Sequence, residues 1–172
     1  PTPECWFRKL SLNGALEPEI FLRVEAIEEP FIERALPAAD EGGNIYRGEN
    51  QANLDYRGTS FGSYQNDYEK HSNELEGDWS DVVDLCFRFD ADTTSSADFP
   101  AAIEEVVDID EWALFFAAFA ILGSTENSIL LNNGDDYFLY HRPSDGKWML
   151  LPWDLDSCFD ESQQVLFRPT VD

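Results

Sequence analysis

Cationic residues are scarce in this sequence of 172 residues, and lysine is the rarest of them. Three Lys and eight Arg stand against 35 Asp and Glu, so the formal net charge is −24. Such an excess of carboxylates repels the phosphate backbone of nucleic acids and the surface of anionic membranes. The composition argues against both partners. It leaves open divalent cations, a cationic partner, a saline environment or simple solubility.

Long apolar runs and patterned cysteines are also lacking. The most apolar stretch, residues 112–122, is far shorter than the ~20 residues of a membrane-spanning helix, so no membrane span is expected. The three cysteines show no CxxC spacing, which argues against a zinc site and against a dense disulfide framework. One disulfide remains open among Cys5, Cys86 and Cys158, and we expect Cys86 to be a small core residue.

The common catalytic motifs GxSxG, GxxxxGK[ST], GxGxxG and HExxH do not occur. Serine hydrolases, P-loop NTPases, Rossmann enzymes and zincins are therefore unsupported. His71 and His141 have no His or Cys at ligand spacing, and we expect His141 to point to solvent from the end of a strand.

Hydrophobic residues make up 43% and aromatic residues 14% of the chain, which is enough for a core. Apolar periodicity and turn residues predict strands first, helices next and a hairpin last, an order typical of an α+β fold. We expect strands at 6–12, 20–26, 44–47 and 54–57, helices at 31–36, 79–89, 99–107 and 109–122, and a hairpin of 137–141 with 148–151. The helix at 109–122 is apolar nearly all round, which predicts a place in the centre of the core.

The strand expected at 148–151 leads into two carboxylates, Asp154 and Asp156. At a spacing of two in an extended chain, both lie on one face, and Leu155 then points into the core. Two carboxylates at a strand end can hold a hard cation such as Mg²⁺. A surface turn with two Asp residues is the alternative from spacing alone.

If the hairpin pairs as expected, Asp135 and Asp136 approach the same strand end. Four crowded carboxylates raise one another's pKa values unless a cation neutralises them, which favours a metal site. A solvated loop is again the alternative. Glu126, just after the apolar helix, completes the polar side of this region.

The runs in this region resemble the CotH family of spore-coat kinase-like proteins, whose pattern is NYYLY…GKW…PWDLD. They are Gly134–Tyr140, Gly146-Lys147-Trp148 and Pro152-Trp153-Asp154-Leu155-Asp156. Weaker matches lie at 12–14, 24–25, 43–47, 68–70 and 107–112, so the resemblance covers roughly residues 5 to 160.

The resemblance implies an atypical protein-kinase-like fold over 1–172, expected to be incomplete at its C-terminus. It divides into a β-rich lobe-like part over 1–60 and a helical part with the metal-carrying hairpin over 78–172. ATP and Mg²⁺ are the implied cofactors. Family members resemble secreted or spore-surface kinases that phosphorylate coat proteins, or cell-surface adhesins, which implies an extracellular or cell-surface location and a coat or surface protein partner.

Carried over residue by residue, the resemblance places the metal-binding aspartate on Asp154, with Asp156 secondary and Asp136 as the second ligand. The family's catalytic Asp has no counterpart, and the nearest carboxylate is Glu126. Arg47 stands where the family has a lysine, so Arg47 or Lys70 would contact phosphates.

Two functions follow. The first is ATP- and Mg²⁺-dependent phosphoryl transfer to a protein acceptor, favoured by the retained PWDLD run. The second is a catalytically inactive extracellular module that binds Ca²⁺ or a protein partner, favoured by the missing Asp and the net charge of −24.

Overall fold

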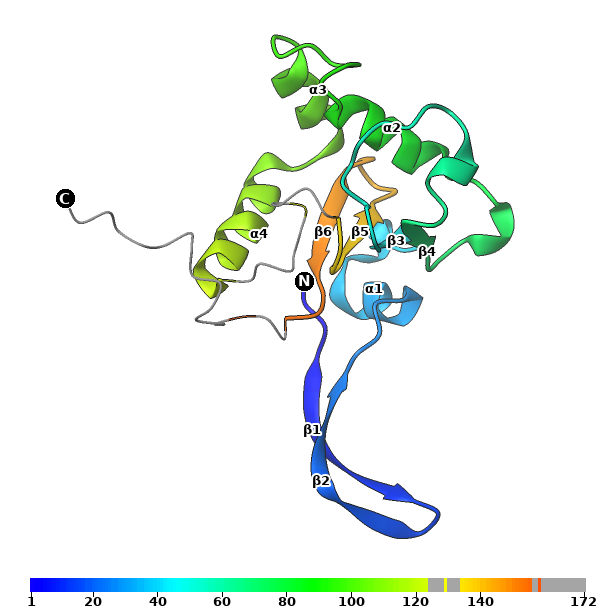
Figure 1. Ribbon diagram of the computed structural model, residues 1–172, viewed down its shortest axis with the longest axis vertical. Coiled ribbons are helices and arrows are strands. Elements are labelled where there is room, and N and C mark those ends of the chain that lie inside the picture. The colour runs from blue at the N-terminus through cyan, green and yellow to red at the C-terminus, as the bar shows by residue number, and fades with distance from the viewer. Residues whose placement is uncertain (124–128, 130–133, 156–157, 159–172) are drawn as a thin grey trace, which may run out of the picture.

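The computed structural model describes residues 1–123, 129, 134–155 and 158 (Figure 1). Its strands are β1 (Cys5–Leu12), β2 (Ala15–Val24), β3 (Asn44–Gly48), β4 (Tyr68–Lys70), β5 (Tyr137–His141) and β6 (Trp148–Pro152). Its α-helices are α1 (Glu29–Ala35), α2 (Ser80–Phe89), α3 (Phe99–Val106) and α4 (Ile109–Leu122). Short 3-10 turns lie at Ala38–Asp40, Phe61–Ser63 and Glu74–Glu76. The expected α+β class is confirmed.

A four-stranded antiparallel sheet in the order β4-β3-β5-β6 forms the centre of the body. The expected hairpin is confirmed: Tyr137 pairs with Pro152 at one end and His141 with Trp148 at the other. The prediction of a strand at 54–57 is wrong, and the sequence analysis missed β4, which lies further along the chain between β3 and α2. Backbone N–H groups of Leu54 and Tyr56 bond to side chains of Tyr68 and Asp90 rather than to a strand.

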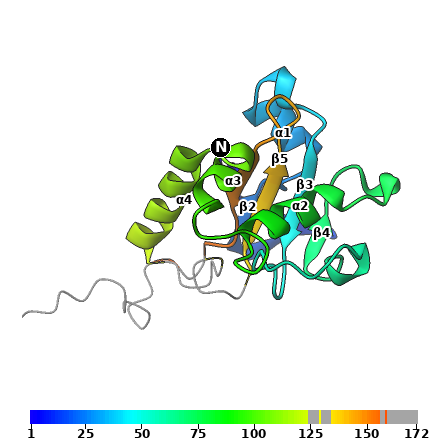
Figure 2. The ribbon, with the colours of Figure 1, turned by 90° about the horizontal axis from the view of Figure 1, so that it is seen from above.

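Both faces of this sheet are covered. One face, with Tyr46, Leu139, Trp148 and Leu150, belongs to a large core formed with α2, α3 and α4. The other face forms a smaller core with α1, and its members include Ile45, Phe138, Tyr140, Met149, Leu151, Phe31 and Ile32. Figure 2 shows the strands between α1 and α2. Strands buried on both sides explain why β5 and β6 are continuous apolar runs rather than alternating ones.

Helix α4 is capped by Asp108, whose side chain accepts a hydrogen bond from the Glu111 N–H. The expected place of α4 in the centre of the core is wrong. Trp112 is buried and donates its indole N–H to the Trp148 carbonyl at 2.7 Å, whereas Leu114 and Ile121 are 70% and 75% exposed. The helix packs through one face against β6, so the opposite face stays outside the core.

Cys86 lies in the large core, as expected, and burial raises the pKa of its thiol to about 12. Cys5 and Cys86 are free thiols. Of the helices in the described ranges, none has the length and apolarity that a membrane span requires.

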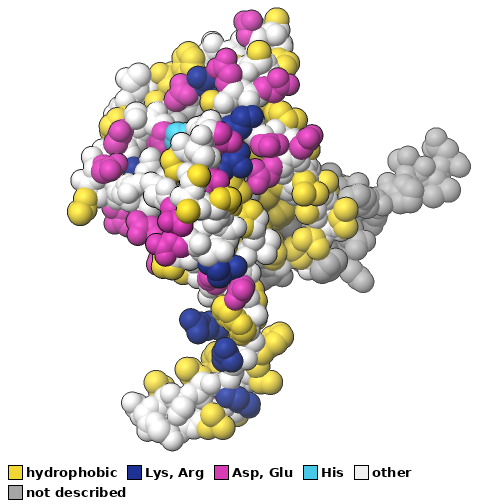
Figure 3. Space-filling view, turned by 180° about the vertical axis from the view of Figure 1, so that it is seen from behind, with side chains coloured by type: hydrophobic (Ala, Val, Ile, Leu, Met, Phe, Trp, Pro, Cys, Tyr) yellow, Lys and Arg dark blue, Asp and Glu magenta, His cyan; other side chains and the backbone are white. Residues whose placement is uncertain are grey.

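Strands β1 and β2 form a two-stranded hairpin that extends away from the body, and we call Cys5–Val24 the arm (Figure 1). Its turn is Asn13-Gly14, with φ of 51° and 83°, the left-handed values that a tight hairpin turn requires. Most arm side chains are exposed. Figure 3 shows cationic side chains along the arm and carboxylates spread over the body.

Candidate functional site

The polar end of the β5–β6 hairpin carries Asp136 and Asp154. Tyr137 pairs with Pro152, so Asp136 directly precedes this last pair and Asp154 follows it by two residues. Both aspartates have left-handed backbones, with φ of 59° and 43°, so the chain turns sharply away from the sheet at each of them. The pairing therefore brings the two predicted metal ligands to one end of the sheet.

The other predictions for this region, which concern Leu155, Asp156 and Glu126, are not confirmed. Leu155 was expected in the core, but its side chain is 44% exposed, because the left-handed turn at Asp154 ends the alternation of the strand. Asp156 and Glu126 lie outside the described residues. Within the described part of the chain, no group of three or more His, Cys, Asp or Glu side chains is placed to hold a metal.

Asp154 lines a cavity of about 370 Å³ between the base of the arm and the segment that follows β6. The arm contributes Cys5, Leu22 and Val24, and the opposite wall is residues 152–155. Thr2 and Pro3 complete the lining. Apart from Asp154 and Thr2, the walls are predominantly apolar, so the cavity is an open apolar groove beside one exposed carboxylate.

Sequence reasoning did not place the arm at this site. Leu22 and Val24 alternate along β2 and so share a face, but their partner across the cavity is 130 residues away in the chain. Only the tertiary structure brings the two segments together. The apolar alternation at 20, 22 and 24 was the one available signal, and it predicts a buried strand face as readily as a ligand wall.

Arg47, on β3, lies beside this site. Its guanidinium is 6.0 Å from the centroid of the Trp153 ring, and its Nε is 2.8 Å from a carboxylate oxygen of Glu49. Trp153 also packs edge-on against Phe138, at 5.4 Å between centroids. The indole therefore fixes the chain next to Asp154 and holds a cationic group nearby.

Lys70, the other predicted phosphate contact, lies in a different environment. Its side chain is only 6% exposed, and its Nζ donates to the Asp78 carbonyl at 2.6 Å. The ammonium also lies 5.4 Å from the Tyr46 ring centroid and 5.5 Å from that of Trp79, at cation–π distance. These contacts attach β4 to the segment before α2 and occupy the ammonium group.

A polar network missed by the sequence analysis joins α2 to the sheet. The Asp81 carboxylate accepts hydrogen bonds from Tyr46 Oη at 2.6 Å and Asn44 Nδ2 at 2.7 Å, and lies 3.1 Å from His141 Nδ1. Burial alone would raise the pKa of Asp81, but the contacts with His141, Tyr46 and Asn44 outweigh it and lower that pKa below its usual value. Burial, with Asp81 nearby, raises the pKa of Tyr46 far above its usual range.

His141 was expected to point to solvent, and this is wrong. Its ring stacks on Trp148, with centroids 4.4 Å apart and planes 5° apart. Its Nε2 lies 3.2 Å from the Gly146 carbonyl. Trp148 and Asp81 thus hold the ring between them, although its position at the strand end is as expected.

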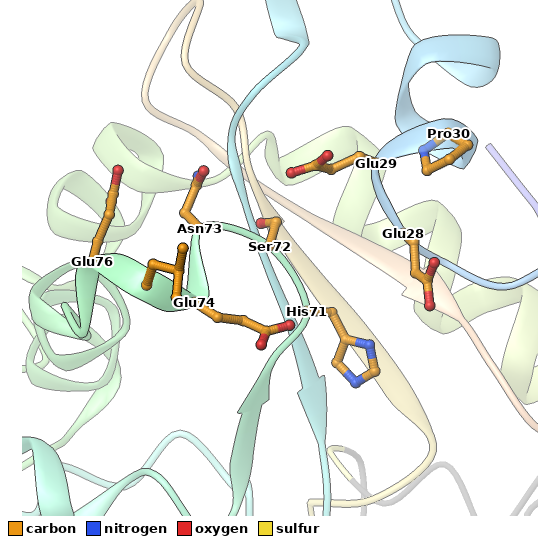
Figure 4. A pocket seen from close by; sticks show the side chains of 9 residues that line it. Glu28, Glu29, Pro30, His71, Ser72, Asn73, Glu74 and Glu76 are labelled. Carbon is orange, nitrogen blue, oxygen red and sulfur yellow. The ribbon is translucent and has the colours of Figure 1, made fainter.

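A second cavity, of about 600 Å³, has acidic walls (Figure 4). Glu28 and Glu29 come from the start of α1, and Glu74 and Glu76 from the turn that follows β4. The cavity shares no lining residue with the one at Asp154. Its carboxylates contribute to the acidic body but bring in none of the predicted site residues.

An antiparallel sheet with helices on its faces defines an α+β protein, and Asp136 and Asp154 lie at one end of its β5–β6 hairpin. The family described as CotH kinase protein matches residues 1–169, and the chain belongs to this family. No curated protein matches the chain. The predicted family membership is therefore confirmed, and with it a kinase-like class of protein.

Proposed function

We propose that the protein transfers the γ-phosphoryl group of ATP to a protein acceptor, with Mg²⁺, as an atypical kinase of the CotH type. The observation that carries the proposal is the position of Asp154. It lies at once in the family's PWDLD run and in the wall of an apolar cavity.

The lining of the cavity supports this proposal. Apolar walls from Leu22, Val24 and Pro152 suit a flat purine ring, and a few polar groups at the edge fix its orientation. Mg²⁺ sites in such enzymes use one or two carboxylates together with phosphate oxygens, so Asp154 and Asp136 are a sufficient protein contribution. Asp156 is the proposed secondary ligand. Bound Mg²⁺ would supply neutralisation of the phosphate charge.

The remaining roles fall to residues around this edge of the sheet. Arg47 is proposed to contact phosphate, because a guanidinium binds phosphate oxygens through two parallel hydrogen bonds. On nucleotide binding, the Arg47 guanidinium would have to leave the Glu49 carboxylate or be shared between that carboxylate and the phosphate. Glu126 is proposed as the base that orients the acceptor hydroxyl. We infer an extracellular or cell-surface location, with a coat or surface protein as acceptor, from the family alone.

A catalytically inactive module that binds Ca²⁺ or a protein partner is the second candidate. The observation that favours it is Lys70, whose ammonium is buried and bonded to a carbonyl, leaving Arg47 as the cation placed beside Trp153 among the described residues. Under this reading Asp154 and Asp136 would bind Ca²⁺ without a nucleotide.

Binding and turnover of Asp154→Asn and of wild type test the proposal. Calorimetry with ATP in Mg²⁺ should show binding to wild type and loss of at least ~10-fold in affinity in the variant, since a charged ligand is removed. Asp110→Asn, on the exposed start of α4, is the matched control and should bind like wild type. Transfer of labelled phosphate to a protein acceptor distinguishes the two candidates. Unchanged nucleotide affinity in Asp154→Asn would refute the metal assignment, and stabilisation by Ca²⁺ alone would favour the inactive module.

A further inference from the structure

The two faces of the arm have different surroundings. Opposite residues of an antiparallel pair share a face, so Phe7 with Leu22 and Lys9 with Ile20 lie on one side. We call this the inner face, because its base, with Leu22 and Val24, lines the cavity at Asp154. The outer face is the opposite one, and the register places Trp6, Arg8, Leu12, Ala15, Phe21 and Arg23 on it. Leu10, Glu17 and Glu19 lie where the register shifts between Lys9 and Ser11, and strand alternation assigns them to the same face.

Both faces of the arm expose apolar side chains. On the outer face Leu12 is 59% exposed, Leu10 46% and Phe21 41%, and on the inner face Phe7 is 78% and Ile20 65% exposed. An isolated two-stranded hairpin is only marginally stable in water, and contiguous exposed apolar side chains mark interaction surfaces. In Figure 1 no described element of this chain lies beside the distal half of the arm, on either face. The arm therefore has the properties of a surface that another molecule covers.

The order of charges along the outer face indicates which molecule this is. Arg8 and Arg23 lie toward the base of the arm, and Glu17 and Glu19 lie toward its tip. If two such faces are laid against each other in antiparallel orientation, the cations of each meet the carboxylates of the other. A face complementary to itself under a two-fold rotation is what an isologous interface requires. A purely acidic or purely basic partner would be repelled by one of the two pairs.

The charge of the rest of the chain is consistent with this arrangement. The arm has three cations and two carboxylates, so it carries +1 while the remaining residues carry −25. At roughly 3.3 Å per residue, the ten residues of β2 span about 30 Å. Antiparallel arms therefore place the two acidic bodies at opposite ends, beyond the ~8 Å screening length at physiological salt.

We propose that the outer face of the arm is a self-association surface, on which the arms of two copies pack antiparallel about a two-fold axis. Leu10, Leu12 and Phe21 form the apolar centre of the contact. Arg8 and Arg23 of each copy pair with Glu17 and Glu19 of the other. The inner face and its cavity stay accessible, so the association does not depend on nucleotide binding.

Sedimentation equilibrium of the full chain, over a range of concentrations near 0.15 M salt, tests the proposal. We expect a reversible monomer–dimer equilibrium. The double variant Arg8→Glu/Arg23→Glu makes the outer face wholly acidic, and Glu17→Lys/Glu19→Lys makes it wholly basic. Each should weaken self-association at least ~10-fold, because several attractive contacts become repulsive at once.

Mixing the two variants gives the decisive measurement. An acidic arm and a basic arm should form a heterodimer more stable than either homodimer, which a folding defect in one variant could not produce. Circular dichroism checks that both variants are folded. Glu104→Lys/Asp110→Lys, an equal charge change on exposed helix positions, is the matched control and should leave the equilibrium as in wild type. A wild type that stays monomeric throughout, or a mixture with no heterodimer, would overturn the proposal.

Discussion

Arg47 and Lys70 lie one position apart in the register of β3 and β4, yet on opposite faces of the sheet. Lys70 pairs with Tyr46, so both point toward α2, whereas Arg47 pairs with Glu69 and Phe138 and approaches Trp153. The two cations therefore cannot act on the same phosphate group in this arrangement. Of the two, only Arg47 is placed beside Trp153 and the Asp154 site.

This separation predicts different outcomes for two matched substitutions. Arg47→Met should lower nucleotide affinity in Mg²⁺ by ~10-fold or more with little change in stability, because its side chain is half-buried at the edge of the site. Lys70→Met should lower stability by about 1–3 kcal/mol, because the Asp78 carbonyl loses its closer donor. Calorimetry and urea unfolding measure the two quantities. Equal nucleotide affinity in both variants would remove Arg47 from the site.

The aromatic face of α4 provides a test of the core. Phe119→Ala should lower the free energy of unfolding by about 3–5 kcal/mol, since Phe119 is 3% exposed and stacks on Phe115 at 4.4 Å. Leu114→Ala on the same helix should cost far less, because that side chain is 70% exposed. Urea unfolding of both variants measures the difference. Similar losses would mean that the exposed face of α4 is covered in solution.

The lowered pKa of Asp81 predicts that part of the folding stability is lost in acid. Its pKa is lower in the folded than in the unfolded protein, so the unfolded protein binds more protons at low pH. The stabilisation by Asp81 is complete well above the unfolded pKa of about 3.9 and is lost as pH falls through the folded pKa. Asp81→Asn should therefore be less stable than wild type at pH 7, with a difference that shrinks toward pH 3. A constant difference across this range would contradict the role of the charge.

Glu126 tests the catalytic step. A positioned general base contributes ~10²–10⁴-fold, so Glu126→Gln should reduce phosphoryl transfer by that order while nucleotide binding stays near normal. Glu126→Asp, which restores the family's shorter side chain, should keep more activity than Glu126→Gln. Equal turnover of wild type and Glu126→Gln would exclude this residue from the mechanism. Nucleotide binding without turnover in either protein would identify an inactive kinase-like module.

Local signals predicted the elements well where turn chemistry was strong. Pro143 and Gly146 marked the turn between β5 and β6, and Asn13-Gly14 marked the turn of the arm. The hairpin register then placed Asp136 and Asp154 at one end of the sheet. The cavity wall could not be predicted, because Val24 and Pro152 meet only through the tertiary fold. The predicted side-chain directions of His141 and Leu155 were wrong for a related reason. Contacts with Trp148 and Asp81 determine the exposure of His141, and the backbone turn at Asp154 determines that of Leu155.

The sheet with a core on each face has a consequence for how the molecule opens. Hydrogen exchange at the amides of β3 and β5 requires both cores to separate from the sheet, because these central strands are buried on both sides and paired on both edges. Their exchange should report global unfolding. Amides of the arm, which lack such cover within one copy, should exchange through local fraying many orders of magnitude sooner. The protein therefore combines a body that unfolds as one cooperative unit with an arm whose order depends on the molecules that pack against it.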